Sequence, residues 1–146
     1  MTIGWCFDNT YFKLPKAFKE DIKPIPVKKP ELVLFNKELG EDLNLNFSDL
    51  NNQRLSELFS GNSLPDGSNS IAQAYAGHQF GHFTMLGDGR AVLIGEHLSK
   101  DNKRYDIQFK GSGKTIFSRN GDGRAALGPM LREYIISESM NGLKIP

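Results

Sequence analysis

The stretch that decides the fold runs from Thr84 to Met140 and holds the motifs MLGDGRAVLIGE (85–96), YDIQFKGSGKT (105–115) and SRNGDGRAALGPMLREYIISESM (118–140). The runs HFTML and RAVLIGEHL on either side of the first GDG are rich in β-branched and large apolar residues, which predicts two strands. Glycine adopts positive φ at no steric cost, so the GDG at 87–89 is predicted to join these strands as a hairpin.

A third strand is predicted in the run that follows, because apolar and polar residues alternate there. The apolar set is Tyr105, Ile107 and Phe109, and the polar set is Asp106, Gln108 and Lys110. This alternation places Lys110 on the opposite face of the sheet from Phe109.

A helix is predicted in ALGPMLREYIISESMNG (126–142), with Pro129 at its first position and Gly142 just after its end. Its core-facing stripe is expected to consist of Leu127, Leu131, Tyr134 and Ile135. Glu133 lies in the middle of this helix on a partly apolar face, where an unpaired buried carboxylate is costly. We therefore expect Glu133 to be paired with a cation.

Residues 1–70 are predicted to form an N-terminal extension with two short helices. The first, in ELVLFNKELGEDL (31–43), is expected to stop at Gly40. The second, in SDLNNQRLSELFSG (48–61), is expected to begin at Ser48 and to end at Gly61. The proline-rich run before them favours an extended arm. Aromatic residues are expected to pin this arm to the body: Trp5, Phe7, Tyr11, Phe12 and Phe18.

Composition places the chain among ordinary globular domains, with 146 residues, 38% of them apolar and 24% charged. The net charge of +1 gives no reason to expect nucleic acid or an anionic membrane as a partner. No run approaches the roughly 20 apolar residues of a membrane-spanning helix. No secretory signal is visible at the start, so the cytoplasm is the expected location.

Two histidines, His78 and His82, stand four residues apart, as in some zinc sites. Gly77 and Gly81 interrupt any helix there, and no third ligand is near in the sequence. We expect structural histidines in a glycine-hinged turn and predict no metal site in this chain.

Positive charge gathers where the glycines are. From Lys100 to Arg124 the sequence has seven basic and three acidic residues, a local net charge of +4. A solvated basic face would account for the charge alone. Glycine and positive charge together favour an anion-binding site.

A P-loop is the first candidate for such a site, because Gly113, Lys114 and Thr115 follow a strand. That motif needs a glycine five residues before the GK pair, a position that Gln108 occupies here. It also needs a helix directly after the threonine. The sequence continues instead through IFSRNGDG, so a P-loop is a poor fit.

The small lobe of a protein-kinase-like fold is the second candidate. Such a lobe combines a glycine-rich hairpin near the phosphates, a strand lysine and a helix glutamate that positions the lysine. The order here is Gly87 to Gly89, then Lys110, then Glu133. We predict an α+β kinase-like lobe over residues 71–146, with an antiparallel sheet and one glutamate-bearing helix.

The longest motifs, GHQFGHFTMLGDGRAVLIGE and DIQFKGSGKTIFSRNGDGRAALGPMLREYIISE, strongly resemble the selenoprotein O (YdiU) family, densely from about Ala72 onward. The resemblance implies a pseudokinase fold and a protein adenylyltransferase, which moves AMP from ATP onto hydroxyl groups of Ser, Thr or Tyr in protein substrates. Uridylyl transfer is also attributed to bacterial members. Mg²⁺ or Mn²⁺ is the implied metal.

The resemblance also implies roles for particular residues. The nucleotide contacts are Gly87, Gly89, Arg90, Lys110, Asp122 and Gly123. Lys110 and Glu133 form the implied catalytic ion pair, which positions the phosphates. The nucleotide is expected to lie flipped relative to a kinase, so that its α-phosphorus faces the acceptor hydroxyl.

Several parts of the family pattern come later than residue 146: the catalytic aspartate, the metal-binding Asn and Asp, two arginines and the C-terminal cysteine or selenocysteine. The chain therefore reads as the front piece of a longer protein that lacks its C-lobe, and we expect it to be inactive alone. Two alternatives stay open. One is a noncatalytic nucleotide-binding or interaction module, including a remnant of a truncated gene, and the other is transfer of the γ-phosphate as in true kinases.

Overall fold

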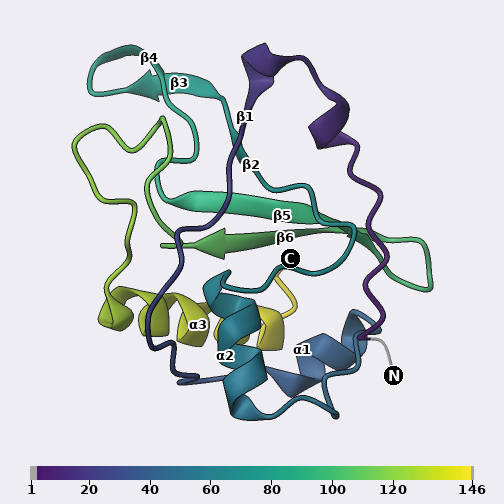
Figure 1. Cartoon of the computed structure of the whole chain (residues 1–146). Helices are drawn as coiled ribbons and strands as arrows, with labels where there is room; N and C mark the ends of the chain where they lie inside the picture. Colours follow the sequence, from purple (N-terminus) through teal and green to yellow (C-terminus); the bar gives the residue numbers. More distant parts are fainter. Residues whose placement is uncertain (1–2, 146) are drawn as a thin grey trace.

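The computed structural model describes residues 3–145 and shows an α+β protein whose helices lie on one side of the long strands of a four-stranded sheet (Figure 1). Neighbouring strands are all antiparallel, in the order β1-β2-β5-β6. The strands are β1 (Lys19–Asp21), β2 (Ile71–Gln73), β5 (Ala91–Leu98) and β6 (Arg104–Lys110). The helices are α1 (Lys37–Asp42), α2 (Asn52–Ser60) and α3 (Leu127–Gly142), and short 3-10 turns cover Tyr11–Lys13 and Lys16–Phe18. The predicted α+β class with an antiparallel sheet is confirmed.

The part of the chain before residue 71 contributes a strand to this sheet, because β1 pairs with β2 along its whole length, from Lys19 opposite Gln73 to Asp21 opposite Ile71. The predicted division at residue 70 stays a prediction, and its two parts share one sheet. None of the helices within residues 3–145 is long and apolar enough to cross a membrane.

The centre of the sheet is β5, where every residue from Val92 to His97 is buried. Val92 and Ile94 pack with Phe109 of β6 and Phe59 of α2 to form the core. A β-bulge lies between Leu93 and Gly95. A side chain at Gly95 would collide with Phe7 and Asn9, so the N-terminal segment crosses β5 at a point where only glycine fits.

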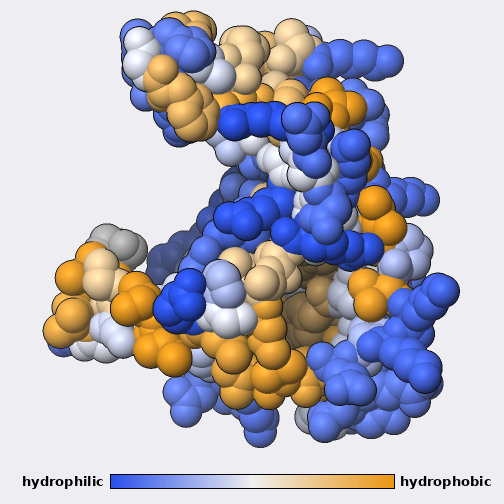
Figure 2. Space-filling model, turned by 90° about the vertical axis from the view of Figure 1, so that its left-hand side faces the viewer, coloured by the Kyte–Doolittle hydropathy of each residue, from blue (hydrophilic) through white to orange (hydrophobic). Residues whose placement is uncertain are grey.

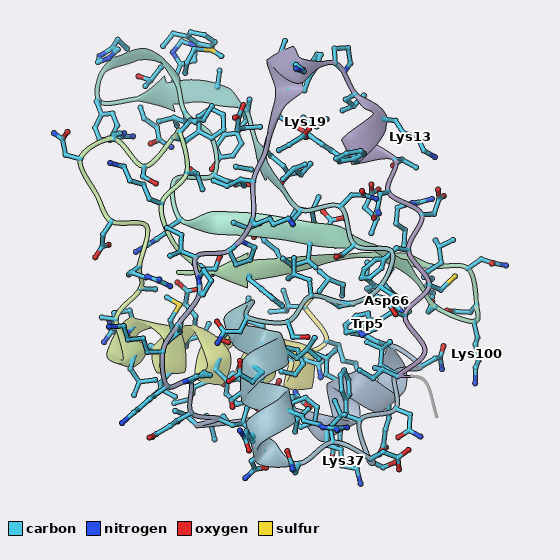
Figure 3. The ribbon with its side chains drawn as sticks, viewed as in Figure 1. Trp5, Lys13, Lys19, Lys37, Asp66 and Lys100 are labelled. Carbon is cyan, nitrogen blue, oxygen red and sulfur yellow. The ribbon has the colours of Figure 1, made fainter. Side chains whose placement is uncertain are left out.

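A row of aromatic rings joins the N-terminal segment to the helices and the sheet. Trp5 stacks on Phe7 with ring centroids 5.4 Å apart and meets Phe47 edge-on at 6.0 Å. Phe47 contacts Phe59, whose ring lies 6.3 Å from that of Phe109. Trp5 lies between the strands and α1 (Figure 3). The expected pinning of the arm by Trp5 and Phe7 is confirmed.

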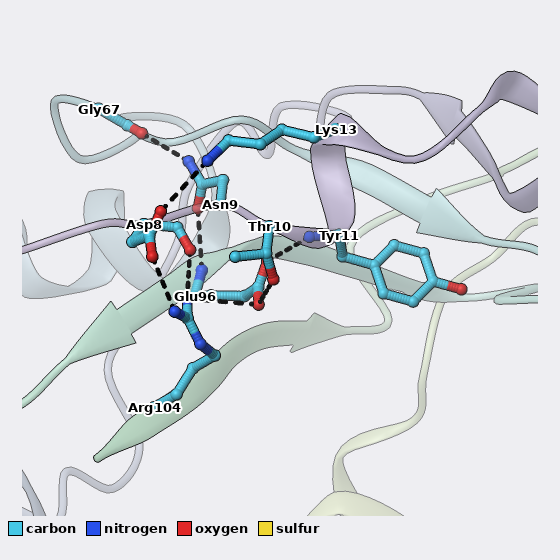
Figure 4. Close-up of polar contacts among 8 residues, drawn as sticks. All are labelled: Asp8, Asn9, Thr10, Tyr11, Lys13, Gly67, Glu96 and Arg104. Atoms are coloured by element: carbon cyan, nitrogen blue, oxygen red, sulfur yellow. Dashed lines mark hydrogen bonds and ion pairs between the residues drawn. The ribbon is translucent and has the colours of Figure 1, made fainter. Parts of the chain in front are cut away.

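A buried carboxylate on β5 provides a second anchor for the N-terminal segment (Figure 4). Glu96 accepts hydrogen bonds from the Thr10 hydroxyl and the Tyr11 backbone N–H, both at 2.6 Å. Arg104 of β6 lies 3.5 Å from Glu96 and 2.7 Å from Asp8, and its hydrogen bond to the Asp8 carboxylate lowers the pKa of Asp8. The sequence reasoning did not foresee this network.

The predicted hairpin through the GDG turn is wrong. The run His82–Met85 forms β4, which pairs with β3 (Ala76–Gln79) in a separate two-stranded ribbon that turns at Phe80 and Gly81. β5 cannot accept β4 as a neighbour because β2 occupies the edge opposite β6. The GDG turn instead links the β3–β4 ribbon to the main sheet.

The predicted starts and stops of the N-terminal helices were partly wrong. Gly40 lies inside α1 and is buried against the Phe47 ring, so it serves close packing rather than termination. α2 begins after Asn51, whose side chain accepts a hydrogen bond from the Arg54 backbone N–H at 2.9 Å, and not after Ser48. Its end at Gly61, in the left-handed region at φ +84°, is confirmed.

α3 also differs from its prediction. It begins at Leu127, two residues before Pro129, and includes Gly142. None of its residues is buried, and Leu127 and Ile135 of the predicted core-facing stripe are 56% and 60% exposed. Periodicity identifies an apolar side of a helix, but not what covers it. In the view of Figure 2, hydrophobic side chains gather on the lower part of the molecule, beneath a hollow with hydrophilic walls.

Candidate functional site

A pocket of about 650 Å³ lies where the GDG turn, the end of β6 and the loop 111–124 meet. The six residues expected to contact a nucleotide all line it: Gly87, Gly89, Arg90, Lys110, Asp122 and Gly123. They come from three separate stretches of sequence, so the fold brings them together. Their role in nucleotide binding stays a prediction.

The GDG turn is held in place by the segment Thr115–Ser118. The Thr115 hydroxyl donates to the Asp88 carbonyl, and the Ser118 hydroxyl donates to the Gly89 carbonyl, both at 2.5 Å. Gly87 has φ +129°, and a side chain there would enter the ring of Phe117. Glycine is therefore needed for both the backbone conformation and the packing of the turn.

The second GDG closes the other wall of the pocket. Gly123, at φ +70°, carries a carbonyl that accepts a hydrogen bond from the Gly113 N–H at 3.2 Å, and a side chain at Gly123 would collide with the Gly113 backbone. The Asp122 carboxylate accepts from the Arg124 N–H at 2.9 Å. The loop 111–124 is thus held by its own backbone, because its beginning at Gly113 and its end at Gly123 are in close contact.

Lys110 and Glu133 form the ion pair that the sequence predicts. The Lys110 ammonium donates to both carboxylate oxygens of Glu133, at 2.7 Å and 2.6 Å, and so joins the end of β6 to α3. Phe109 is buried on the opposite face of β6, as the alternation requires. The two paired side chains are 40% and 53% exposed, so the pair lies at the surface beside the pocket.

The charges around the pocket favour an anion. Four basic side chains line it (Arg90, Lys110, Arg119 and Arg124), against the two carboxylates of Asp88 and Asp122. Asp88 is buried and accepts from the Gln73 N–H at 3.0 Å, and its burial raises the pKa of its carboxyl. Burial and the nearby Asp88 also raise the pKa of Tyr75.

Sequence reasoning missed the side chains that hold the pocket together, above all Thr115 and Ser118. Their signal is hydroxyl residues spaced three apart in a glycine-rich loop, where short side chains often bond to nearby backbone. It was present in TIFS (115–118), but the partner carbonyls lie some 30 positions earlier in the chain.

Residues 3–145 contain no group of three or more His, Cys, Asp or Glu side chains arranged to hold a metal ion. His78 and His82 lie on the two strands of the β3–β4 ribbon. The ring of His78 contacts Phe83, and His82 Nδ1 lies 3.0 Å from the Phe80 carbonyl oxygen. The described side chains therefore do not fit a resident divalent metal by themselves.

The fold and the site define an α+β protein with a basic, glycine-walled pocket beside a strand-lysine and helix-glutamate pair. The chain belongs to the SelO family, whose model, described as protein adenylyltransferase SelO, matches residues 3–146. It is 72% identical to the protein nucleotidyltransferase YdiU of Pelagibacter ubique over 146 residues and 65% identical to that of Nitrosococcus oceani over 144. The protein of the same name from Brevibacillus brevis is 57% identical over 143 residues. The matches cover 98% to 100% of this chain but only about 30% of these relatives' lengths.

Proposed function

We propose that this chain is the nucleotide-binding part of a protein nucleotidyltransferase that transfers AMP from ATP to Ser, Thr or Tyr hydroxyls of protein substrates. The observation that carries the proposal is the convergence of six expected nucleotide contacts on one basic pocket, beside Lys110 paired with Glu133. The names of the relatives support the reaction class.

The arrangement of the sheet and α3 supports a kinase-like small lobe. In such lobes a strand lysine bound to a helix glutamate contacts the nucleotide phosphates. Here β6 carries Lys110 at its last position and α3 carries Glu133. The glycine-rich element is the link between the β3–β4 ribbon and β5 rather than a hairpin of the main sheet, but its glycines still line the pocket.

In the proposed reaction the acceptor hydroxyl oxygen attacks the α-phosphorus of ATP. A bond forms between that oxygen and phosphorus, the bond to the bridging oxygen breaks, pyrophosphate leaves with the electron pair, and the hydroxyl proton passes to a base. Lys110 would stabilise negative charge on the phosphates, and Glu133 would hold its ammonium in place. Gly87 and Gly89 would let the backbone approach the nucleotide closely.

The base and the ligands of Mg²⁺ or Mn²⁺ are proposed to lie outside this chain, in the C-lobe that the family pattern implies. The metal would neutralise phosphate charge when bound. Since the described residues hold no ligand set for it, we propose that the 146-residue chain binds nucleotide without transferring it. UTP is the second donor to test, because the pocket contacts proposed here involve phosphates rather than the base.

Incubation with α-³²P-ATP and Mg²⁺ or Mn²⁺ tests the proposal, using this chain beside the full-length relative from Pelagibacter ubique. Label on protein from the relative only, together with ATP binding by this chain, is the expected result. Transfer by this chain alone would contradict its predicted inactivity. Label from γ-³²P-ATP but not from α-³²P-ATP would indicate kinase chemistry, and ATP binding with no transfer by either protein would favour a noncatalytic module.

A further inference from the structure

Two bulky residues adopt the left-handed backbone conformation and meet at the edge of the pocket. The non-glycine residues with positive φ among the described ones are Asn44, Phe80, Asn102, Arg119 and Lys144. Asparagine tolerates this conformation, and Lys144 comes one residue after Leu143, the C-cap of α3, at a position where helices commonly end in it. Phe80 at +59° and Arg119 at +53° have no such explanation.

Phe80 and Arg119 contact each other although 39 positions separate them. The Arg119 guanidinium carbon lies 5.1 Å from the centre of the Phe80 ring, which is the geometry of a cation–π interaction. Phe80 lies in the turn of the β3–β4 ribbon, and Arg119 lies in the loop 111–124 and lines the pocket. In Figure 1 this loop rises beside the ribbon.

The turn of the ribbon makes Phe80 an unusual choice. Phe80 and Gly81 both have positive φ, as in a type I′ turn, where Asn or Asp usually precedes glycine. Phe80 is also 68% exposed, so burial does not repay its strained backbone. Strained, exposed residues of this kind cluster at functional sites. The presence of a phenylalanine in this turn is better explained by the contact of its ring with the Arg119 guanidinium.

Arg119 is also free to bind a ligand. Lys110 already donates to Glu133, which would hold its ammonium for the phosphates, and Arg124 donates to the Ile25 carbonyl at 3.2 Å. Arg119 has no ion pair with any carboxylate in residues 3–145, and its contact with an aromatic face leaves its N–H groups available. The neighbouring Ser118 is fixed to Gly89, which holds the Arg119 backbone at the pocket.

We infer that Arg119 is a further phosphate-binding residue of this pocket and that Phe80 is the positioning residue that holds its guanidinium there. The inference rests on the proposed function, since the anion is the phosphate chain of the nucleotide. Guanidinium groups bind phosphate oxygens through two parallel hydrogen bonds, which reward a fixed orientation.

The test is the affinity of the 146-residue chain for ATP, pyrophosphate and adenosine, measured by calorimetry. Arg119→Asn, which suits positive φ, should weaken ATP and pyrophosphate binding about tenfold or more, as for a lost charge-assisted hydrogen bond, and leave adenosine binding unchanged. Phe80→Asn should weaken ATP binding about threefold, the size of an exposed cation–π contact. Combined, the two changes should weaken it no more than Arg119→Asn alone.

The melting temperatures of the variants show whether Phe80 positions Arg119 or only supports the fold. Asn suits the turn better than Phe, so Phe80→Asn should raise or preserve the melting temperature while ATP affinity falls, and Phe80→Tyr should retain the affinity. Phe83→Asn is the matched control, because Phe83 is 61% exposed on the same ribbon and contacts His78 instead. Its ATP affinity should match that of the unchanged chain.

The outcomes distinguish the two proposals. A folded, unchanged chain that binds neither ATP nor pyrophosphate overturns the proposed function and this inference with it. Binding by the unchanged chain and equally tight binding by the folded Arg119→Asn variant overturns the inference alone. Equal losses for Phe80→Asn and Phe83→Asn would overturn the positioning role of Phe80.

Discussion

Lys110 at the end of β6 donates to both carboxylate oxygens of Glu133 in α3, at 2.7 Å and 2.6 Å. Both side chains are about half exposed, so solvent screens their attraction. An exposed pair of this kind contributes no more than about 1 kcal/mol to folding. The main effect of the pair is to fix the Lys110 ammonium beside a basic pocket. Its effect on ligand binding can be measured separately from its effect on stability.

Lys110→Ala should weaken ATP binding by about tenfold or more, the cost of one charge-assisted hydrogen bond, and Glu133→Gln should weaken it less. The free energy of unfolding should change by less than about 1 kcal/mol in both variants. Calorimetry and urea denaturation measure the two quantities. Lys103→Ala is the control, because Lys103 forms an equally short, exposed pair with Asp101 at 2.7 Å and does not line the pocket. Equal ATP affinity in Lys110→Ala and Lys103→Ala would rule out the proposed role of Lys110.

Gly87→Ala should destabilise the protein by about 1–3 kcal/mol, because a methyl group at φ +129° would enter the Phe117 ring. ATP binding should fall with it, since Phe117 and the GDG turn share the pocket. Thermal and urea unfolding measure the first effect and calorimetry the second.

Gly128→Ala is the matched control for Gly87→Ala. A side chain at Gly128 meets nothing within 4 Å, and this glycine lies in α3, where alanine is favoured by up to about 1 kcal/mol. The control should be as stable as the unchanged chain or more stable. A Gly87→Ala variant with unchanged stability would mean that the turn relaxes without cost.

Local sequence patterns correctly predicted the features that depend on residues close together in the sequence. Alternation placed Lys110 opposite Phe109, and the glycine at 61 marked the end of α2. The predicted pairing of β4 with β5 was wrong, because distant segments compete to pair with each strand. β5 pairs with β2, a three-residue strand in IAQAYAG whose sequence shows no clear strand pattern.

The same reasoning explains the partial prediction of the site. Glycine and charge marked the pocket, because both are visible in single motifs. The contacts that hold it, such as Ser118 to Gly89 and Arg119 to Phe80, join residues 29 and 39 positions apart and leave no local pattern. The sequence placed Glu96 only in a strand, because its hydrogen-bond partners Thr10 and Tyr11 lie more than 80 positions away and leave no local pattern.

Glu96→Gln should destabilise the protein by about 1–3 kcal/mol, because a neutral amide replaces a buried carboxylate that accepts two short hydrogen bonds and lies beside Arg104. The N-terminal segment should become more sensitive to proteolysis, and ATP affinity should stay unchanged since Glu96 does not line the pocket. Glu38→Gln, an exposed change in α1, serves as the control. Unchanged proteolysis of Glu96→Gln would show that the aromatic row alone anchors the segment.

Asp88 predicts a pH dependence of stability with a definite sign. Burial raises the pKa of its carboxyl above the ordinary 3.8, so the folded protein binds this proton more tightly than the unfolded chain. The associated stability is fully present below 3.8 and is lost as the pH rises through the folded-state pKa. Asp88→Asn removes this titration, and its neutral amide still offers an oxygen to the Gln73 N–H. The variant should therefore gain stability relative to the unchanged chain between acid pH and about pH 7, as measured by urea denaturation across that range.

Asp101→Asn should show the opposite slope in the same experiment. Hydrogen bonds from Lys103 and Ser99 lower the pKa of Asp101 to about 2, so its stabilising contribution is present above 3.8 and is lost as the pH falls toward 2. Relative to the unchanged chain, Asp101→Asn should therefore lose stability as the pH rises from acid. Parallel slopes for the two variants would mean that burial does not control the Asp88 carboxyl, because the two aspartates differ in the sign of their pKa shifts.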